Sequence, residues 1–150
     1  MAGSLWGTTP HRSIEAACGR RGTGTVVREC LTLLGGGDAD PSTVEALAGP
    51  GAPRLLDAPP EQRYWLRVWG ARGLLWALAM PGAPAADAKR VCGPLLEALG
   101  DEHWRVREMA LKVVARYRLD DAQPAVVGLL DDATPRVRTA AARALRLLTA

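Results

Sequence analysis

Nucleophile and base side chains gather near the start of the chain, at His11, Ser13, Glu15 and Cys18. Such residues catalyse group transfer when a base activates the nucleophile and a third group orients the base. No orienting third group is evident around this segment. The glycine-containing stretch 19–25, GRRGTGT, lacks the Gly-Lys-Ser/Thr ending of a phosphate-binding loop. The sequence therefore predicts no catalytic residues here.

Metal and disulfide chemistry is also not expected. The three cysteines are far apart, form no C-x-x-C motif and do not lie at ligand spacing from the two histidines. We therefore expect buried thiols, no metal, no cofactor and a reducing compartment. The N-terminal segment has no apolar core of a signal peptide, and Arg67 and Arg72 interrupt the most apolar stretch, 64–80. These features predict a cytoplasmic protein that does not span a membrane, and the Ala, Gly, Pro and Arg bias favours a bacterial source.

The sequence contains an internal repeat. Residues 101–117, DEHWRVREMALKVVARY, recur in looser form at 132–148, DATPRVRTAAARALRLL, with an offset of 31. Each copy has an acidic residue, a Val-Arg pair, a small residue and then apolar residues at helical spacing. A weaker copy at 61–79 fits with an offset of 40. Self-similarity near thirty residues in a helix–turn–helix unit indicates a solenoid.

Helical periodicity and breakers predict the elements that carry these repeats. No segment shows the alternation of a strand, so the fold is expected to be all-α. A loose arm is expected at 1–10 and a linker at the PGAP of 81–84. Asp40 or Ser42 is expected to cap a helix with Pro41 in its first turn. The helices are expected at about 11–19, 25–34, 41–48, 55–56, 61–79, 86–99, 102–118, 122–130 and 135–148.

The segments LLEALGDEHWRVREMALKVVARY and VVGLLDDATPRVRTAAARALRLL resemble HEAT repeats of the short, bacterial, phycobilisome-lyase-like type. The D-x-x-P-x-V-R-x-x-A-A-x-A-L string of the second copy carries the resemblance most clearly. It implies a right-handed solenoid of antiparallel helix pairs that binds other macromolecules without catalysis. We therefore expect a single domain, with degenerate helices at 1–50 and repeats at 55–79, 91–118 and 122–148.

The repeat itself suggests structural roles for its recurring residues. Ala110 and its counterparts Gly70 and Ala141 are expected to be small because two helices approach closely there. Asp101 and Asp132 are expected at helix N-caps, joined to the recurring arginines in a ladder between repeats. The nearby Trp104 invites a comparison of Asp101 with the acidic residue of HEAT-like DNA glycosylases, an alternative that rests on one residue pair.

The positions that the repeat leaves variable are the candidate binding residues. They lie on the opposite arc of each second helix, where neighbouring repeats would form a continuous stripe, basic at one end and Trp-rich at the other. A second interpretation is that the tryptophans are core, covered by the N-terminal helices. The candidates are Arg105, Lys112, Arg116, Arg136, Arg143, Arg72, Trp65, Trp69 and Trp76.

Two kinds of partner fit such a stripe. A protein partner is expected first, through an acidic amphipathic segment. A nucleic acid is the alternative, with phosphates on arginine and bases stacked on tryptophan. The apolar end formed by Leu145, Leu147 and Leu148 lacks a polar capping unit, which predicts either dimerisation through that end or its partial exposure.

Overall fold

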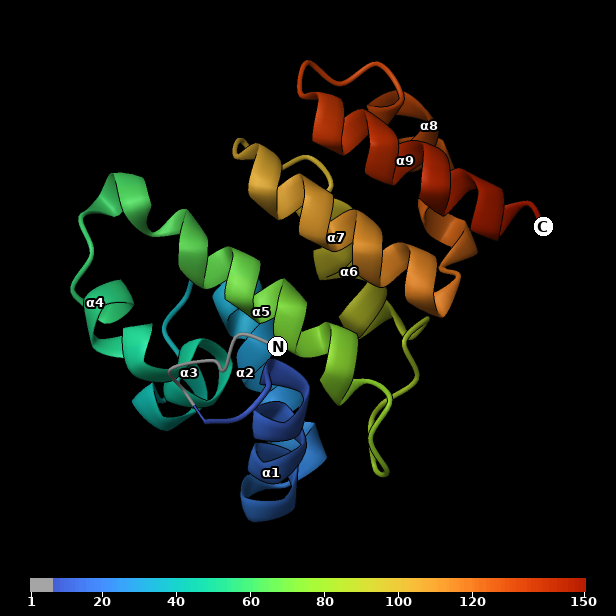
Figure 1. Cartoon of the computed structure of the whole chain (residues 1–150). Coiled ribbons are helices and arrows are strands. Elements are labelled where there is room, and N and C mark those ends of the chain that lie inside the picture. The colour runs from blue at the N-terminus through green and yellow to red at the C-terminus, as the bar shows by residue number, and fades with distance from the viewer. Residues whose placement is uncertain (1–6) are drawn as a thin grey trace. The chain divides into compact units, whose positions relative to one another are not determined.

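The computed structural model describes residues 7–150, all of which are helical or connecting (Figure 1). Nine α-helices and three short 3-10 helices, with no strand, make up this part of the chain, which confirms the all-α prediction. The chain divides into two compact units, Met1–Ala83 and Pro84–Ala150. This boundary falls inside the predicted linker. The single-domain prediction stays a prediction, and positions 1–6 of the predicted arm lie outside the described residues.

Unit 1 begins with three helices, and side-chain caps mark the starts of the first and the third. The Thr9 hydroxyl accepts the Arg12 N–H at 3.2 Å before the first helix, and the Asp40 carboxylate accepts the Ser42 N–H at 2.8 Å before the third. The second helix ends at Gly35, where a run of three glycines begins. The cap predicted at Asp40 is therefore confirmed. The helices of unit 1 are α1 (Pro10–Arg21), α2 (Thr23–Leu34), α3 (Pro41–Ala48), α4 (Ala52–Leu56) and α5 (Tyr64–Ala77).

The main packing of unit 1 joins α2 to α5. A Cβ atom added to Gly70 would lie 2.7 Å from the Cys30 carbonyl oxygen and 2.9 Å from the Leu34 nitrogen. Because these are backbone atoms, only glycine allows the helices to approach so closely. The short α4, predicted as the first helix of the 55–79 repeat, packs instead against α3. The helix that pairs with α5 is thus α2, which ends at Leu34, before α3 and α4 in the chain.

A polar network holds the N-terminal helices together. The Arg21 guanidinium on α1 donates to both oxygens of Glu29 on α2, at 2.5 and 3.0 Å. Both side chains also bond the buried Thr43 hydroxyl of α3. The network satisfies the polar groups where these three helices meet, so it is assigned a structural role.

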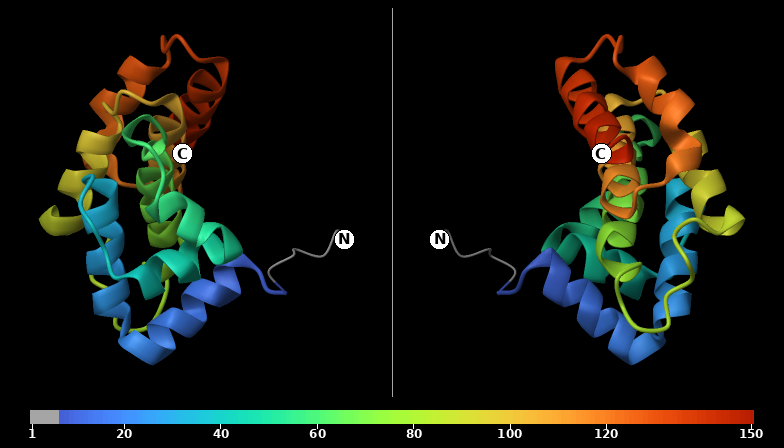
Figure 2. Two further views of the ribbon diagram at one scale, coloured as in Figure 1. Left: turned by 90° about the vertical axis from the view of Figure 1, so that its left-hand side faces the viewer. Right: turned by 90° about the vertical axis from the view of Figure 1, so that its right-hand side faces the viewer.

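Unit 2 consists of two helix pairs. Figure 2 shows α6 and α8 in one layer and α7 and α9 in the other. Val106 and Ala110 on α7, and Val137 and Ala141 on α9, are fully buried. The predicted packing face of the repeat is therefore confirmed. The helices are α6 (Lys89–Ala98), α7 (Trp104–Tyr117), α8 (Gln123–Leu129) and α9 (Pro135–Leu148), and a 3-10 helix (Asp120–Ala122) precedes α8.

Candidate functional site

The recurring aspartates stabilise the turns before α7 and α9. The Asp101 carboxylate accepts the His103 N–H, and the Asp132 carboxylate accepts the Thr134 N–H, each at 2.8 Å. The N-cap residues are His103 and Thr134 themselves. The prediction that the aspartates are N-caps is therefore wrong by two residues. Each carboxylate acts one step earlier, on the N–H of the residue that caps the helix.

The recurring arginines complete the turns and link the two repeats. Arg107 donates to the Asp101 carbonyl, and Arg138 to the Asp132 carbonyl, at 2.8 and 2.7 Å. Arg107 also binds the Asp132 carboxylate of the following repeat, at 2.8 and 3.1 Å. Burial opposes ionisation of Asp132, but hydrogen bonds from Arg107 and Thr134 and the nearby arginine charges outweigh it and lower its pKa. The predicted Asp–Arg ladder is therefore present, and it is structural.

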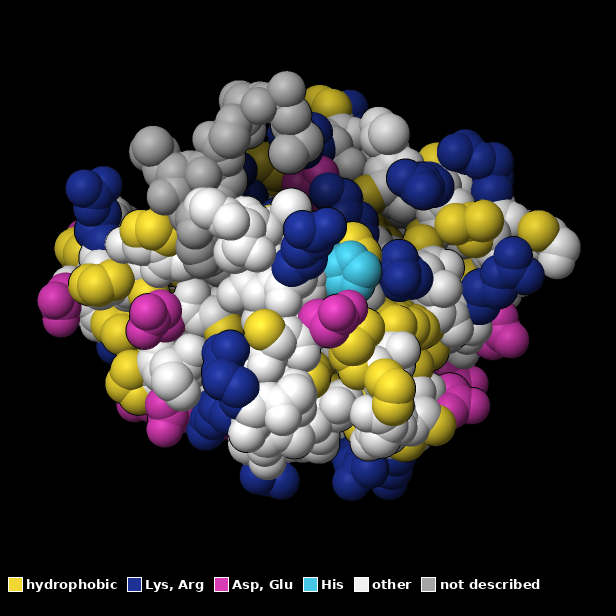
Figure 3. Space-filling view, turned by 60° about the horizontal axis from the view of Figure 1, so that its bottom comes forward, with side chains coloured by type: hydrophobic (Ala, Val, Ile, Leu, Met, Phe, Trp, Pro, Cys, Tyr) yellow, Lys and Arg dark blue, Asp and Glu magenta, His cyan; other side chains and the backbone are white. Residues whose placement is uncertain are grey.

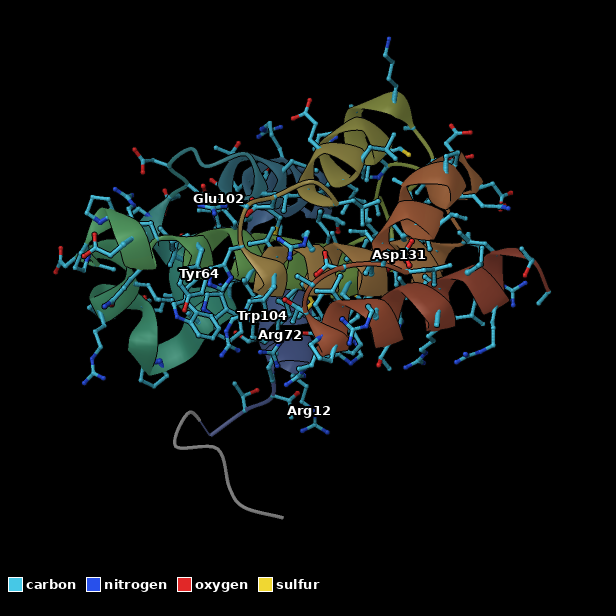
Figure 4. The ribbon with its side chains drawn as sticks, turned by 90° about the horizontal axis from the view of Figure 1, so that it is seen from above. Arg12, Tyr64, Arg72, Glu102, Trp104 and Asp131 are labelled. Atoms are coloured by element: carbon cyan, nitrogen blue, oxygen red, sulfur yellow. The ribbon has the colours of Figure 1, made fainter. Side chains whose placement is uncertain are left out.

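Trp104 lies at the first turn of α7 (Figure 4). Two arginines approach its ring. The guanidinium carbons of Arg105 and Arg136 lie 4.5 and 5.8 Å from the ring centroid. Cation–π attraction at these distances holds both cations close to the half-buried indole. The predicted candidates Arg105 and Arg136, from neighbouring repeats, are thus brought together around an aromatic residue that was not among the predicted binding residues.

Glu108 is the acidic residue of this surface. Its carboxylate accepts hydrogen bonds from Arg136 at 3.2 and 3.0 Å and lies 3.5 Å from the Lys112 amine. The Glu108 side chain is only 12% exposed, whereas that of Arg136 is 66% exposed. The single acid is therefore covered by the cations that it binds, and the accessible charge is positive.

Two further candidates extend this basic surface. Arg116 and Arg143 are both exposed, on α7 and α9 respectively. The guanidinium of Arg116 lies 5.8 Å from the Tyr117 ring centroid. Burial raises the pKa of Tyr117, and the hydrogen bond and charge of Arg116 offset part of this effect. We call the five predicted basic candidates on these packed helices the α7–α9 face; its members are Arg105, Lys112, Arg116, Arg136 and Arg143.

The candidates on α5 have a different setting. Trp65, Trp69 and Trp76 are all half-buried, neither fully open nor fully core. Trp76 stacks on His11 of α1, with ring centroids 4.6 Å apart and planes 18° apart. Helix α1 therefore covers one end of the tryptophan-bearing face of α5, as the interpretation of the tryptophans as core residues expected. The predicted continuity of the stripe across the repeats stays a prediction.

The other end of α5 borders a groove. Trp65 and Trp69 stack with centroids 6.3 Å apart, and the Arg72 guanidinium lies 4.8 Å from the Trp69 centroid. Burial lowers the pKa of Arg72. The groove, which we call the tryptophan groove, has a volume of about 300 Å³. It is lined by Ala48, Gly51, Arg54, Leu55, Ala58, Gln62, Trp65 and Trp69.

Sequence reasoning identified the two tryptophans of this groove but not the groove. The spacing of Trp65 and Trp69 places them on one helix face. The opposite wall comes from residues 48–58, and no periodic signal in the sequence marks their place beside α5. On the face of the molecule that Figure 3 draws, basic and hydrophobic side chains are interspersed.

The nucleophile cluster near the N-terminus is assigned to structure. The Ser13 hydroxyl donates to the Ala46 carbonyl at 2.7 Å, which joins α1 to α3. Cys18 is buried, and burial raises the pKa of its thiol, although a hydrogen bond with Thr23 offsets part of this effect. His11 stacks on Trp76 and lies 3.8 Å from Glu15. The described residues also include no group of His, Cys, Asp and Glu side chains that could hold a metal ion.

Comparison with known proteins agrees with the repeat geometry. A family model for HEAT repeats matches residues 70–146, slightly more than half of the chain. The chain belongs to the HEAT-repeat family. The HEAT match begins within α5 and ends within α9, so it contains the first clear copy of the repeat and all but the last two residues of the second. A search of the curated proteins and a search of the solved structures each returned no match.

Membership of this family defines the general character of the protein. HEAT repeats are helical scaffolds that typically mediate protein interactions, and they are generally non-catalytic. Within residues 7–150, no helix has the length and apolar character needed to cross a membrane.

Proposed function

We propose that this HEAT-repeat protein is a non-catalytic scaffold or adaptor that binds a protein partner through the outer face of its second helices. In unit 2 the binding surface is the α7–α9 face. In unit 1 the proposed contribution comes from α5, through Trp65, Trp69, Trp76 and Arg72. No cofactor is expected to take part.

The observation that carries this proposal is the charge of the α7–α9 face. Its cations come from two packed helices, and the one acid among them, Glu108, is covered by Lys112 and Arg136. A surface of this kind complements an acidic segment, which it would attract and orient. Trp104 adds an aromatic side chain, of the type that often anchors protein interfaces.

The test is to neutralise the face and compare a matched variant. The first variant replaces Arg105, Lys112, Arg136 and Arg143 with Gln. The control replaces four exposed cations elsewhere, Arg12, Arg20, Lys89 and Arg90, so that both variants lose the same charge. A partner protein that co-purifies with the wild type and the control, but not with the first variant, supports the proposal. Equal retention by all three proteins contradicts it.

Nucleic-acid binding through the same face is the second candidate. The two arginines beside the Trp104 ring resemble sites where a base stacks on an aromatic ring and phosphates bind cations. Retention of the purified protein on single-stranded DNA or RNA should then fall steeply with salt. The same pair of variants distinguishes binding through the α7–α9 face from binding through net charge, since only the first variant would then lose retention.

A DNA-repair activity on the HEAT scaffold is the remaining alternative. It would require Asp101 to act on a damaged base, whereas its carboxylate binds the His103 N–H. Glycosylase activity that Asp101→Asn abolishes would be needed to support this alternative.

A further inference from the structure

We propose that the tryptophan groove of unit 1 binds a peptide segment that carries a large apolar side chain beside a carboxylate. The inference rests on the proposed function in one respect, since it assigns to Trp65 and Trp69 a role in partner binding. It concerns residues 48–72 alone, however, and it holds or fails independently of the α7–α9 face.

The groove has the shape and lining of an apolar anchor site. Its volume of about 300 Å³ is at the lower end of ligand pockets. Two indole rings and Leu55 form apolar walls, while Ala48, Gly51 and Ala58 leave the space between them open. A space of this size fits one or two large side chains of a partner, rather than a dinucleotide or a haem.

The tryptophan wall is held in place by contacts along α5. The Trp65 ring lies 5.2 Å from Tyr64 and 6.3 Å from Trp69, with interplanar angles of 31° and 26°. The guanidinium of Arg72 then lies against Trp69. A wall that is already ordered loses little further side-chain entropy when a ligand binds, which favours a short segment as the ligand.

The positive charge at the groove favours a ligand that carries a carboxylate. Arg54 lines the groove, is exposed, and makes no ion pair with any described residue. Arg72, beside Trp69, also has no carboxylate partner among the described residues. Asp57 and Glu61 are exposed nearby in the chain, but no carboxylate lines the groove. Two uncompensated guanidinium groups beside an apolar wall match a carboxylate next to an apolar side chain.

The experiment uses blocked peptides as probes and the indole N–H signals of the full chain as the readout. The first probe has a Leu-Phe pair flanked by glutamates. The second has lysines in place of the glutamates, and the third has alanines in place of Leu-Phe. In ¹H–¹⁵N spectra, the first probe should shift the indole signals of Trp65 and Trp69, with a Kd on the order of 0.1–1 mM. The signal of Trp104 should not move.

Two variants test the site itself. Ala58→Leu fills the groove, and its matched control Ala16→Leu adds the same side chain at an exposed position of α1. We expect the first to weaken binding by about tenfold and the control to leave it unchanged. Arg54→Glu should reverse the preference, so that the lysine probe binds better than the glutamate probe.

The outcomes of these experiments support or overturn the proposal, and they test it independently of the function proposed for unit 2. Shifts at Trp65 and Trp69 that need both the apolar pair and the glutamates support it. Three outcomes overturn it: absence of shifts up to 5 mM of the first probe (about fivefold above the expected range), binding of the lysine or the alanine probe as tight as that of the first probe, or binding by Ala58→Leu as tight as by Ala16→Leu. The variant with a neutralised α7–α9 face must bind the first probe like the wild type, whatever its effect on the protein partner.

Discussion

Arg107 and Asp132 form a two-bond ion pair that joins one HEAT repeat to the next. The Nε and Nη2 atoms of Arg107 lie 2.8 and 3.1 Å from the two oxygens of Asp132. The side chains are 16% and 7% exposed, so solvent screens the pair only weakly. The same guanidinium donates to the Asp101 carbonyl in its own turn. One side chain therefore holds two consecutive turns of unit 2 in register.

The first prediction concerns the loss of this link. Arg107→Ala should lower the free energy of unfolding by about 2–4 kcal/mol, because it leaves the Asp132 charge buried without its partner. Arg138→Ala is the control, since Arg138 donates to the Asp132 carbonyl from an exposed position. It should cost no more than about 1 kcal/mol. Urea unfolding followed by circular dichroism measures both values, and equal losses would contradict the ladder.

The second prediction is a pH dependence. The pKa of Asp132 is lowered in the folded protein, so its ionised form stabilises the fold above the pKa of the unfolded chain, about 3.9. This stabilisation is lost as the pH falls through the folded pKa. The free energy of unfolding of the wild type should therefore approach that of Asp132→Asn when the pH is lowered from 6 towards 3 (roughly the range in which an Asp titrates). A difference that stays constant over this range would exclude the linkage.

The third prediction tests the close approach of α2 and α5. Gly70→Ala places a methyl group against the backbone of Cys30 and Leu34. We expect a loss of about 1–3 kcal/mol, because a helix must shift to make room. Gly19→Ala in α1 has no atom within 4 Å of the new Cβ and should be neutral or stabilising by up to about 1 kcal/mol. Thermal unfolding of the two variants shows whether each substitution lowers or raises the stability of the fold.

The sequence predicted unit 2 well because its information is local and repeated. Helix α9 spans the predicted residues, and Arg107 and Asp132 are joined as the repeat indicated. Their spacing recurs, so each copy supports the interpretation of the other. The displacement of Asp101 and Asp132 from the N-cap was missed because a carboxylate can bind the N–H of a capping residue as well as cap a helix itself.

Unit 1 was predicted less well because its main contacts are distant in sequence. The pairing of α2 with α5 connects segments separated by the loop, α3 and α4, and no repeat period marks it. The tryptophan groove depends on where residues 48–58 pack, and helical spacing on α5 alone carries no such information. Periodicity identifies which face of a helix is apolar, whereas tertiary packing decides how much of that face is covered.

The fourth prediction concerns Glu108, which neutralises part of the α7–α9 face. Glu108→Gln removes its charge and releases Lys112 and Arg136 from their ion pairs. The variant should elute from a heparin column at higher salt than the wild type, since heparin is a general polyanion probe. Glu97→Gln, at an exposed position of α6, makes the same change in net charge. If both variants shift equally, the effect belongs to bulk charge rather than to this face.

The fifth prediction concerns self-association through the last repeat. Val127 on α8 is 47% exposed, and Leu145, Leu147 and Leu148 on α9 are half-buried. If a second copy covers these side chains, the mass measured by light scattering should rise from 15.9 kDa towards twice that value as concentration increases. Val127→Glu should keep the protein at the monomer mass, because a charge would be buried in the interface. Ala79→Glu, exposed in unit 1, should associate like the wild type, and a wild-type monomer at every concentration would contradict the prediction.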